Sequence, residues 1–330
     1  MKKLFALVAL VLGVVSCQTD PNDLDVVVGG EREVMLNVSL PEATRAADAD
    51  SAKGGLANVN LSDYDIRYIL EVYRAVDENT ILTEKCQRQV KCADAAEMSF
   101  PVRLAPGYNY QIVVWADFIN DYDAEGNALD LHYDTSNGLD AIEVISWNAM
   151  DETRDAYTGT KYIADFSSGS DLSMALTRPF AKVRVVATDI KDITDLGLSP
   201  KAAKVSYSQD MYTKYNAVTD EASAAEAKSH EYKTFPYDDA VGEMTLFADY
   251  VFVPESGGTA KFSLNVYDDE AATRLIKENS FSTDIFVERN KITTIKGDVL
   301  TEGGDVNVGI EDEFGGESGI EDGKTFAKVD

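Results

Sequence analysis

Apolar residues recur at every second position in many short stretches of this chain, and this alternation limits the fold more than any other feature. The clearest run has apolar side chains at four alternate positions, Val34, Leu36, Val38 and Leu40. Comparable runs lie within residues 66–72, 108–116, 183–187, 262–266 and 285–294. A period of two buries one face of a strand and leaves the other face wet. The sequence therefore predicts antiparallel β-sheets rather than βαβ units.

The number of such runs and the length of the chain predict an all-β protein with two β-sandwich domains. The chain has 330 residues, of which 45% are hydrophobic, which is enough to build a core. A break at residues 176–179, which ends in Pro179, separates two sets of strands. We expect a tether over residues 17–31, an N-terminal sandwich over 32–177, a C-terminal sandwich over 178–300 and a C-terminal strand or tail over 301–330. Residues 220–229, rich in Ala and Glu, are the best helix candidate, with a loop as the alternative.

The first residues are typical of a secretory signal peptide that ends at a lipidated cysteine. Lys2 and Lys3 precede an apolar run over residues 4–15, which is too short to span a membrane. The run ends in Val-Val-Ser-Cys, which resembles the lipobox of bacterial lipoproteins, with Cys17 as the modified residue. No Asp directly follows this cysteine, so the resemblance implies an outer-membrane address. We expect removal of residues 1–16 and a lipid on Cys17.

Charge and motif content argue against several classes of function. The 58 acidic residues outnumber the 30 basic residues, so we expect no nucleic-acid partner. The sequence contains neither the glycine-rich phosphate loop nor the G-x-S-x-G motif of hydrolases. His132 and His230 are isolated, and we expect them on the surface or in loops rather than at a catalytic centre. We therefore predict no enzyme activity, no cofactor and no metal site.

One acidic segment begins like a calcium-binding EF-hand loop, with Asp121, Asp123, Glu125 and Gly126 at matching positions. His132 stands at the twelfth position, where that loop needs a bidentate Glu. We therefore interpret the segment as a solvated hairpin loop, with adventitious calcium binding as the alternative.

Two cysteines follow Cys17, and they lie six positions apart between two apparent strands. An exported chain reaches a compartment in which disulfides can form. We therefore predict a loop-closing disulfide between Cys86 and Cys92, with two free thiols as the alternative.

Four further segments carry a recognisable pattern when they are read in order after the lipobox. They are Val113–Phe118, His132–Thr135, Leu176–Val183 and Arg289–Gly297. Together they resemble the Bacteroidales fimbrillin family of pilus subunits, the type V pilin lipoproteins, over most of the chain. The resemblance implies two transthyretin-like antiparallel β-sandwich domains, export as a lipoprotein, and proteolytic maturation before assembly.

The resemblance also implies a processing site. Subunits of this family are cut after an arginine, which here places the cut between Arg45 and Ala46, in a stretch of small and polar residues. The cut would release the alternating strand that carries Val34, Leu36, Val38 and Leu40. A sandwich without one strand exposes unpaired backbone groups and an apolar groove, which together form a template for a strand of another chain.

The donor strand is expected near the C-terminus. Val306, Val308 and Ile310 alternate correctly, and residues 325–329 form a second candidate. The alternative for both segments is a last domain strand followed by a solvated tail.

These observations predict a structural subunit of a bacterial surface fimbria. It would first be anchored to the outer membrane through the lipid on Cys17, and then joined to other copies or related subunits by donor-strand exchange. The alternative is an uncut outer-membrane lipoprotein that acts as an adhesin, with loops that bind a glycan or protein of a host or bacterial surface.

Overall fold

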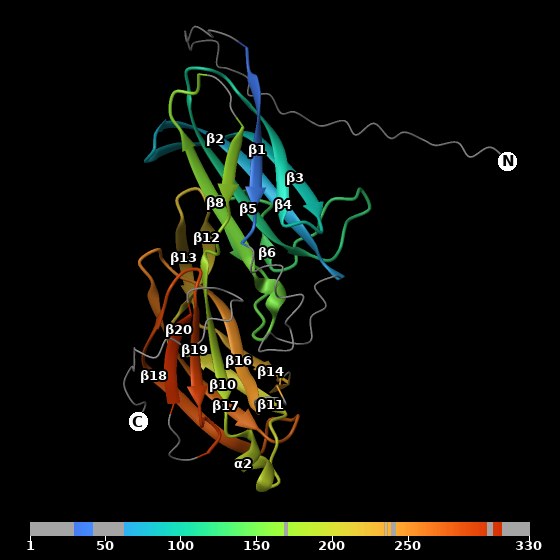
Figure 1. Cartoon of the computed structure of the whole chain (residues 1–330), viewed down its shortest axis with the longest axis vertical. Helices are drawn as coiled ribbons and strands as arrows, with labels where there is room; N and C mark the ends of the chain where they lie inside the picture. The colour runs from blue at the N-terminus through green and yellow to red at the C-terminus, as the bar shows by residue number, and fades with distance from the viewer. Residues whose placement is uncertain are drawn as a thin grey trace, which may run out of the picture.

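A computed structural model describes residues 30–41, 63–167, 171–233, 235, 237–238, 242–301 and 306–311. The molecule is elongated, with β1 (Arg32–Ser39) in the half at one end and α2 (Ile190–Asp195) at the opposite end (Figure 1). The sequence prediction of an all-β fold is confirmed, because β-sheets contain most of the described residues. Among the described residues, no helix is long and apolar enough to cross a membrane.

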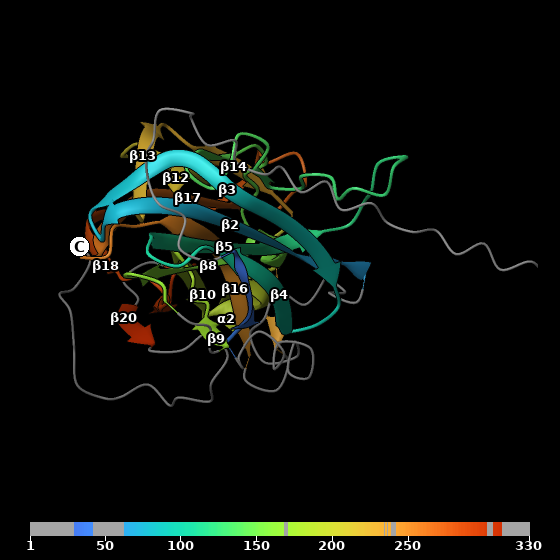
Figure 2. The same cartoon turned by 90° about the horizontal axis from the view of Figure 1, so that it is seen from above.

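The N-terminal half is a sandwich of two sheets, which are seen as two layers in Figure 2. The smaller sheet has the order β4-β1-β9, with β4 at Glu97–Leu104 and β9 at Leu172–Ala175. The larger sheet has the order β3-β2-β5-β8 and comprises β2 (Asp65–Asp77), β3 (Thr80–Ala93), β5 (Asn109–Ile119) and β8 (Ala156–Ile163). Alternate apolar residues of both sheets meet in a closed core, as the period of two predicts.

The C-terminal half contains two further sheets around a second core. The first has the order β15-β16-β10-β19-β20 and comprises β10 (Phe180–Ala187), β15 (Tyr237–Asp238), β16 (Glu243–Phe252), β19 (Ile292–Gly297) and β20 (Val306–Glu311). The second has the order β14-β11-β17-β18 and comprises β11 (Ala202–Tyr207), β14 (Ser229–Tyr232), β17 (Gly258–Tyr267) and β18 (Leu275–Val287).

A fifth sheet joins segments from both sides of the predicted domain boundary. Its order is β13-β12-β7-β6, with β6 at Tyr133–Asp134, β7 at Ile142–Val144, β12 at Met211–Asn216 and β13 at Glu221–Glu226. The 3-10 turn η2 (Glu152–Arg154) lies between β7 and β8. The division into residues 32–177 and 178–300 stays a prediction, and this sheet crosses it.

The helix expected over residues 220–229 is not formed, because the segment contains β13. That strand pairs antiparallel with β12, with Ser223 opposite Lys214. Ala224 has a φ of 54°, in the left-handed region that a right-handed helix excludes. Pairing with a neighbouring strand has overridden the helix propensity of Ala and Glu.

The predicted disulfide between Cys86 and Cys92 is wrong in this structure. Both residues lie on one continuous strand, β3, rather than at the two ends of a loop. An extended strand rises about 3.3 Å per residue, so six positions separate the two Cα atoms by roughly 20 Å. A disulfide requires Cα atoms within about 7 Å, so these thiols cannot join without unfolding the strand.

Candidate functional site

Strand β1 is the central strand of the smaller N-terminal sheet. It pairs antiparallel with β4, where Leu36 lies opposite Phe100, and parallel with β9, where Leu36 lies opposite Leu172. Residues far apart in the sequence therefore hydrogen-bond to both edges of this one strand. Removing β1 would leave unpaired N–H and C=O groups on two neighbours at once.

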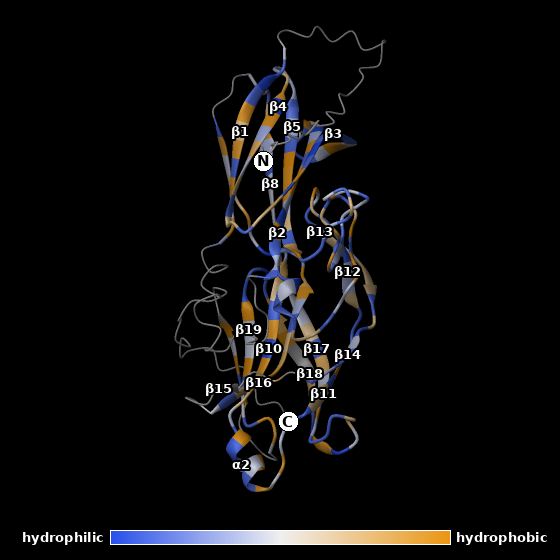
Figure 3. Cartoon of the chain, turned by 90° about the vertical axis from the view of Figure 1, so that its right-hand side faces the viewer, coloured by the Kyte–Doolittle hydropathy of each residue, from blue (hydrophilic) through white to orange (hydrophobic). Residues whose placement is uncertain are grey.

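The apolar side chains of β1 and the residue after it fill the core of the N-terminal sandwich. Their exposed fractions are 4% for Val34, 0% for Leu36, 2% for Val38 and 7% for Leu40. They pack with residues of the same core cluster on both neighbouring strands and on the facing sheet, including Phe100, Val102, Leu104, Met174, Leu70 and Val114. Figure 3 shows the alternation of apolar and polar residues along β1. The predicted burial of this strand is therefore observed, and its displacement stays a prediction.

The outward face of β1 carries polar contacts that fix its register against β4. Ser99 donates a hydrogen bond from Oγ to Oδ1 of Asn37 over 2.7 Å. Glu33 and Arg103 form an exposed ion pair with a separation of 3.6 Å. Because a slip by one residue would exchange the buried and exposed faces, the two contacts reinforce a register that burial already requires.

The candidate donor residues lie on β20, an edge strand of the C-terminal half. β20 pairs antiparallel with β19, and Val308 lies opposite Ile295. Val306, Val308 and Ile310 are only partly buried, in contrast to the apolar residues of β1. The second candidate, residues 325–329, lies outside the described residues, as do Cys17, Arg45 and Ala46.

The sequence segments that carried the resemblance meet at the junction between the two halves. Trp115 of β5 packs edge-on against Tyr133, with ring centroids 5.3 Å apart, and Tyr133 contacts Phe180 of β10 at 5.9 Å. These rings belong to a third apolar cluster that contains residues from both halves. These segments therefore form the contact between the two halves, here called the joint. They do not line the site that β1 occupies.

A group of buried ion pairs accompanies this aromatic joint. Arg154 pairs with Asp249 of β16, and the two side chains are 1% and 0% exposed. Burial lowers the pKa of Arg154, but Asp249 more than offsets this effect, so the guanidinium stays protonated. The carboxylate of Asp249 also accepts hydrogen bonds from Trp147 Nε1, at 3.0 Å, and from the hydroxyl of Tyr207, at 2.7 Å.

Two further ion pairs at the joint link η2 and the residue that follows it to the segment at the start of β10. Arg178 binds Asp155 over 2.7 Å, and Lys182 pairs with Glu152. Sequence reasoning did not predict these interactions. The available signal was the placement of Arg178 and Lys182 within a segment of apolar residues that leads into a buried strand, since a charge there needs a partner.

His132 lies in the loop that leads into β6, which is one of the two placements expected, but its side chain is buried rather than exposed. Its side chain is 4% exposed, and Nε2 lies 2.7 Å from Oγ1 of Thr153. Burial lowers the pKa of His132, against the opposing effect of Asp151 at 3.7 Å. The contacts link the β6 region to η2, which is a structural role.

The acidic loop that begins at Asp121 is held by its own hydrogen bonds. Asp123 Oδ1 accepts from the backbone N–H of Asn127 over 2.7 Å, and the Asn127 amide donates to Oδ2 over 2.9 Å. These bonds lower the pKa of Asp123. Within the part of the chain that the structure describes, no group of three or more acidic, His or Cys residues is arranged to hold a metal ion.

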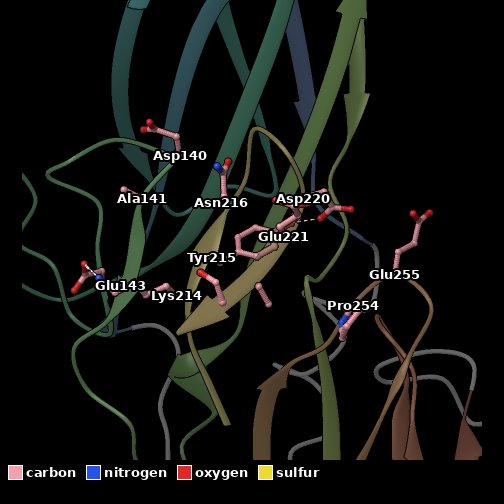
Figure 4. Close-up of a pocket in the computed structure, with 12 residues that line it drawn as sticks. Asp140, Ala141, Glu143, Lys214, Tyr215, Asn216, Asp220, Glu221, Pro254 and Glu255 are labelled. Carbon is pink, nitrogen blue, oxygen red and sulfur yellow. Dashed lines mark hydrogen bonds and ion pairs between the residues drawn. The ribbon is translucent and has the colours of Figure 1, made fainter. Parts of the chain in front are cut away.

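The hollow drawn in Figure 4 lies beside β7, β12 and β13 and has a volume of about 450 Å³. Five carboxylate side chains line it, those of Asp140, Glu143, Asp220, Glu221 and Glu255. Lys214 pairs with Glu143, and Arg289 binds Asp220 over 2.6 Å. The cations at this hollow are thus engaged with its acids.

Comparison with known sequences gives a family for the chain but no activity. Residues 25–329 match a family of unknown function, DUF6562. The chain belongs to this family. No curated protein matches the sequence.

Several solved structures resemble this DUF6562 member. One is a fimbrial assembly protein from Parabacteroides distasonis, with 12% identity, a TM-score of 0.45, and coverage of 84% of this chain and 95% of the other. A candidate cell adhesion protein from Bacteroides ovatus has 13% identity, a TM-score of 0.48, and coverage of 86% and 99%. The fimbrial anchor protein Mfa2 from Porphyromonas gingivalis has 12% identity, a TM-score of 0.42, and coverage of 85% and 97%. Fimbrial proteins of Bacteroidales are thus among the solved structures to which this chain is similar.

Proposed function

We propose that this DUF6562 protein is a structural subunit of a bacterial surface fimbria that is exported as a lipoprotein, cut after Arg45 and assembled by donor-strand exchange. The observation that carries the proposal is the position of β1. It is the central strand of its sheet and buries its alternate apolar side chains, and the proposed cut falls shortly after Leu40, in the connection to β2. After the cut, only non-covalent contacts would retain β1.

The site between β4 and β9 that β1 occupies is here called the slot. The energetics favour binding of another strand in the slot once β1 leaves. Burying the four side chains of Val34, Leu36, Val38 and Leu40 contributes roughly 1.5–3 kcal/mol each, which gives about 6–12 kcal/mol before entropy costs. The backbone hydrogen bonds to β4 and β9 add an alignment requirement that only another extended strand can meet. An empty slot would therefore bind a strand with a matching alternation.

Strand β20 matches β1 in more than its period. Residues 36–40 read Leu-Asn-Val-Ser-Leu, and residues 306–310 read Val-Asn-Val-Gly-Ile. Both have the order apolar, Asn, Val, small, apolar. If β20 of a second copy entered the slot in the direction of β1, Asn307 would take the place of Asn37 opposite Ser99. We propose this register for the donor.

The release of β20 from its own domain is less costly than the release of β1. Among the described residues β20 lies at the edge of its sheet and pairs only with β19, and its apolar side chains are partly exposed. β1, by contrast, pairs on both sides and buries its apolar side chains. In the precursor, β1 is covalently attached to the rest of the chain. This attachment explains why the chain's own strand would occupy the slot until the cut.

The first experiment substitutes Arg45→Ala in the native host. We expect lipidated monomers in the outer membrane and loss of polymer, while a control with Arg274→Ala, an exposed arginine between β17 and β18, should still assemble. Mass spectrometry of the N-terminus should find Ala46 in wild-type fimbriae. A wild-type protein that begins at Cys17 on the surface would instead support the uncut adhesin.

The second experiment tests the proposed register by cross-linking. In a background with Cys86→Ser and Cys92→Ser, the pair Asn307→Cys and Ser99→Cys should form disulfide-linked polymers under oxidation. Moving the second cysteine to Asn109, at the start of β5, is the matched control and should give none. Equal cross-linking of both pairs would reject the register.

A further inference from the structure

The outer edge of β4 carries an unusual set of side-chain hydrogen bonds. β4 is the edge strand next to β1, and an edge strand ordinarily presents a row of unpaired N–H and C=O groups to other chains. Here the side chains of β3, from the facing sheet, reach across the sandwich and bond to that row.

Three residues of β3 supply these bonds. Gln87 Nε2 donates to the carbonyl of Arg103, and Gln87 Oε1 accepts from the N–H of the same residue over 3.1 Å. Gln89 Nε2 donates to the carbonyl of Pro101 over 2.7 Å. Lys91 Nζ donates to the carbonyl of Ser99 over 2.6 Å.

The spacing of the contacts follows from the pleat of both strands. Positions 87, 89 and 91 share one face of β3, and they pair with Val72, Leu70 and Tyr68, whose side chains belong to the N-terminal core. The acceptors at 99, 101 and 103 are alternate residues of β4, so their backbone groups point to the same side of that strand. The middle acceptor, Pro101, has no N–H and leaves no donor to satisfy.

We propose that Gln87, Gln89 and Lys91 are specificity-determining residues that close the β4 edge, so that an incoming strand can add to this sheet only in the β1 slot. This inference rests on the proposed function, because it concerns the position in the sheet at which the donor strand adds. Without this closure, the edge of β4 would offer a competing template directly beside the slot.

The opposite edge of the sheet has a related arrangement. β9 is short, and Lys161 of β8 donates from Nζ to the carbonyl of Ser173 over 3.2 Å. A lysine of the facing sheet thus donates a hydrogen bond to a backbone carbonyl of each edge strand. A strand that adds outside β1 would have to displace these side chains before it gained any backbone hydrogen bond.

The test uses the full-length precursor with Arg45→Ala, in which β1 stays in its slot. The triple variant Gln87→Ala, Gln89→Ala and Lys91→Ala should self-associate with an apparent dissociation constant at least about tenfold lower than that of the parent. The control variant Thr83→Ala, Glu84→Ala and Val90→Ala removes three exposed side chains of the same strand and should leave association unchanged. Sedimentation velocity measures both.

Hydrogen exchange identifies the edge that is used. The amide of Arg103 should lose protection in the monomeric triple variant and regain it on association. If the triple variant does not fold, the pair Gln89→Ala and Pro101→Ala opens the same edge with a smaller change. A folded variant that remains as monomeric as the control overturns the proposal. If cleaved wild-type protein fails to polymerise, the proposed function is overturned instead. The effect of the triple variant on association would still stand.

Discussion

Buried charged residues in the described part of this protein are accompanied by specific partners, as Arg154 shows. Arg154 is almost completely buried, and its guanidinium bonds to the carboxylate of Asp249 and to the carbonyl of Tyr250 over 3.0 Å. Taking a charge out of water is costly, and the pair offsets that cost only while both members remain. The joint between the halves is therefore sensitive to single substitutions.

Removing the guanidinium tests this dependence. Arg154→Ala should lower the free energy of unfolding by roughly 3–5 kcal/mol, because Asp249 would stay buried without its cation. Lys191→Ala removes an exposed pair with Asp195 and should leave the stability unchanged within error. Urea denaturation of both variants measures the difference, and equal losses would contradict the assigned role of burial.

The histidines predict a loss of stability on mild acidification. Burial lowers the pKa of both His132 and His230 in the folded protein. Below the unfolded value of about 6.5, the unfolded chain binds more protons than the folded chain, so stability falls as pH falls. Above that value the contribution is fully present.

Replacing the histidines should reduce this dependence. We expect the unfolding free energy of the wild type to decrease between about pH 7 and pH 5.5, and the decrease to be smaller in His132→Gln. The double variant with His230→Gln should be nearly flat over the same range. Unfolding by urea at each pH checks this, and an unchanged slope in the double variant would contradict it.

At the scale of elements, β1 shows how far the alternation of a sequence predicts a strand. Its apolar positions could be assigned to a buried face because only a period of two places them together. The strands with which it pairs could not be assigned, since β4 and β9 are distant in the sequence. Its position at the centre of a sheet, which makes its release consequential, became evident only in the fold.

The energetic importance of β1 can be measured in the uncut chain. Leu36→Ala should destabilise the precursor by roughly 2–5 kcal/mol, because it leaves a cavity in a closed core. Glu33→Ala, which loses an exposed ion pair, should change stability by less than about 1 kcal/mol. Denaturation of the Arg45→Ala precursor provides the comparison, and a small effect at Leu36 would argue against β1 as a core element.

The errors made from sequence also belong to this scale. The Ala- and Glu-rich segment of β13 has local helix propensity, yet its neighbour β12 provides a ladder of backbone hydrogen bonds. Cys86 and Cys92 suggested a loop because they lie between two apparent strands, but the segment is part of the continuous edge strand β3. In both cases tertiary pairing overrode the local signal.

For the whole molecule, the joint determines whether the halves act as one body. The third cluster includes Trp115 from the N-terminal sandwich and Phe180 and Phe252 from the C-terminal one. The rings of Phe180 and Phe252 have centroids 4.5 Å apart and are fully or almost fully buried. We expect a single cooperative unfolding transition for the intact protein.

Truncating the joint should uncouple that transition. Phe180→Ala should cost roughly 3–5 kcal/mol and separate the thermal unfolding of the two halves into distinct steps. Phe286→Ala, at a residue that is 52% exposed on β18, should preserve one step. Scanning calorimetry distinguishes the two outcomes, and a single step in Phe180→Ala would show that the halves are coupled by other contacts.

The sequence alone determined the all-β class and the buried face of β1, because the period of two and the burial of apolar groups are local properties of a chain. The tertiary structure decided which strands lie beside one another, how charges such as Arg154 and Asp249 are paired, and how β3 covers the edge of β4. Those contacts join residues that are distant in the sequence. Such contacts depend on how the sheets pack together in space, a property that no short segment encodes by itself.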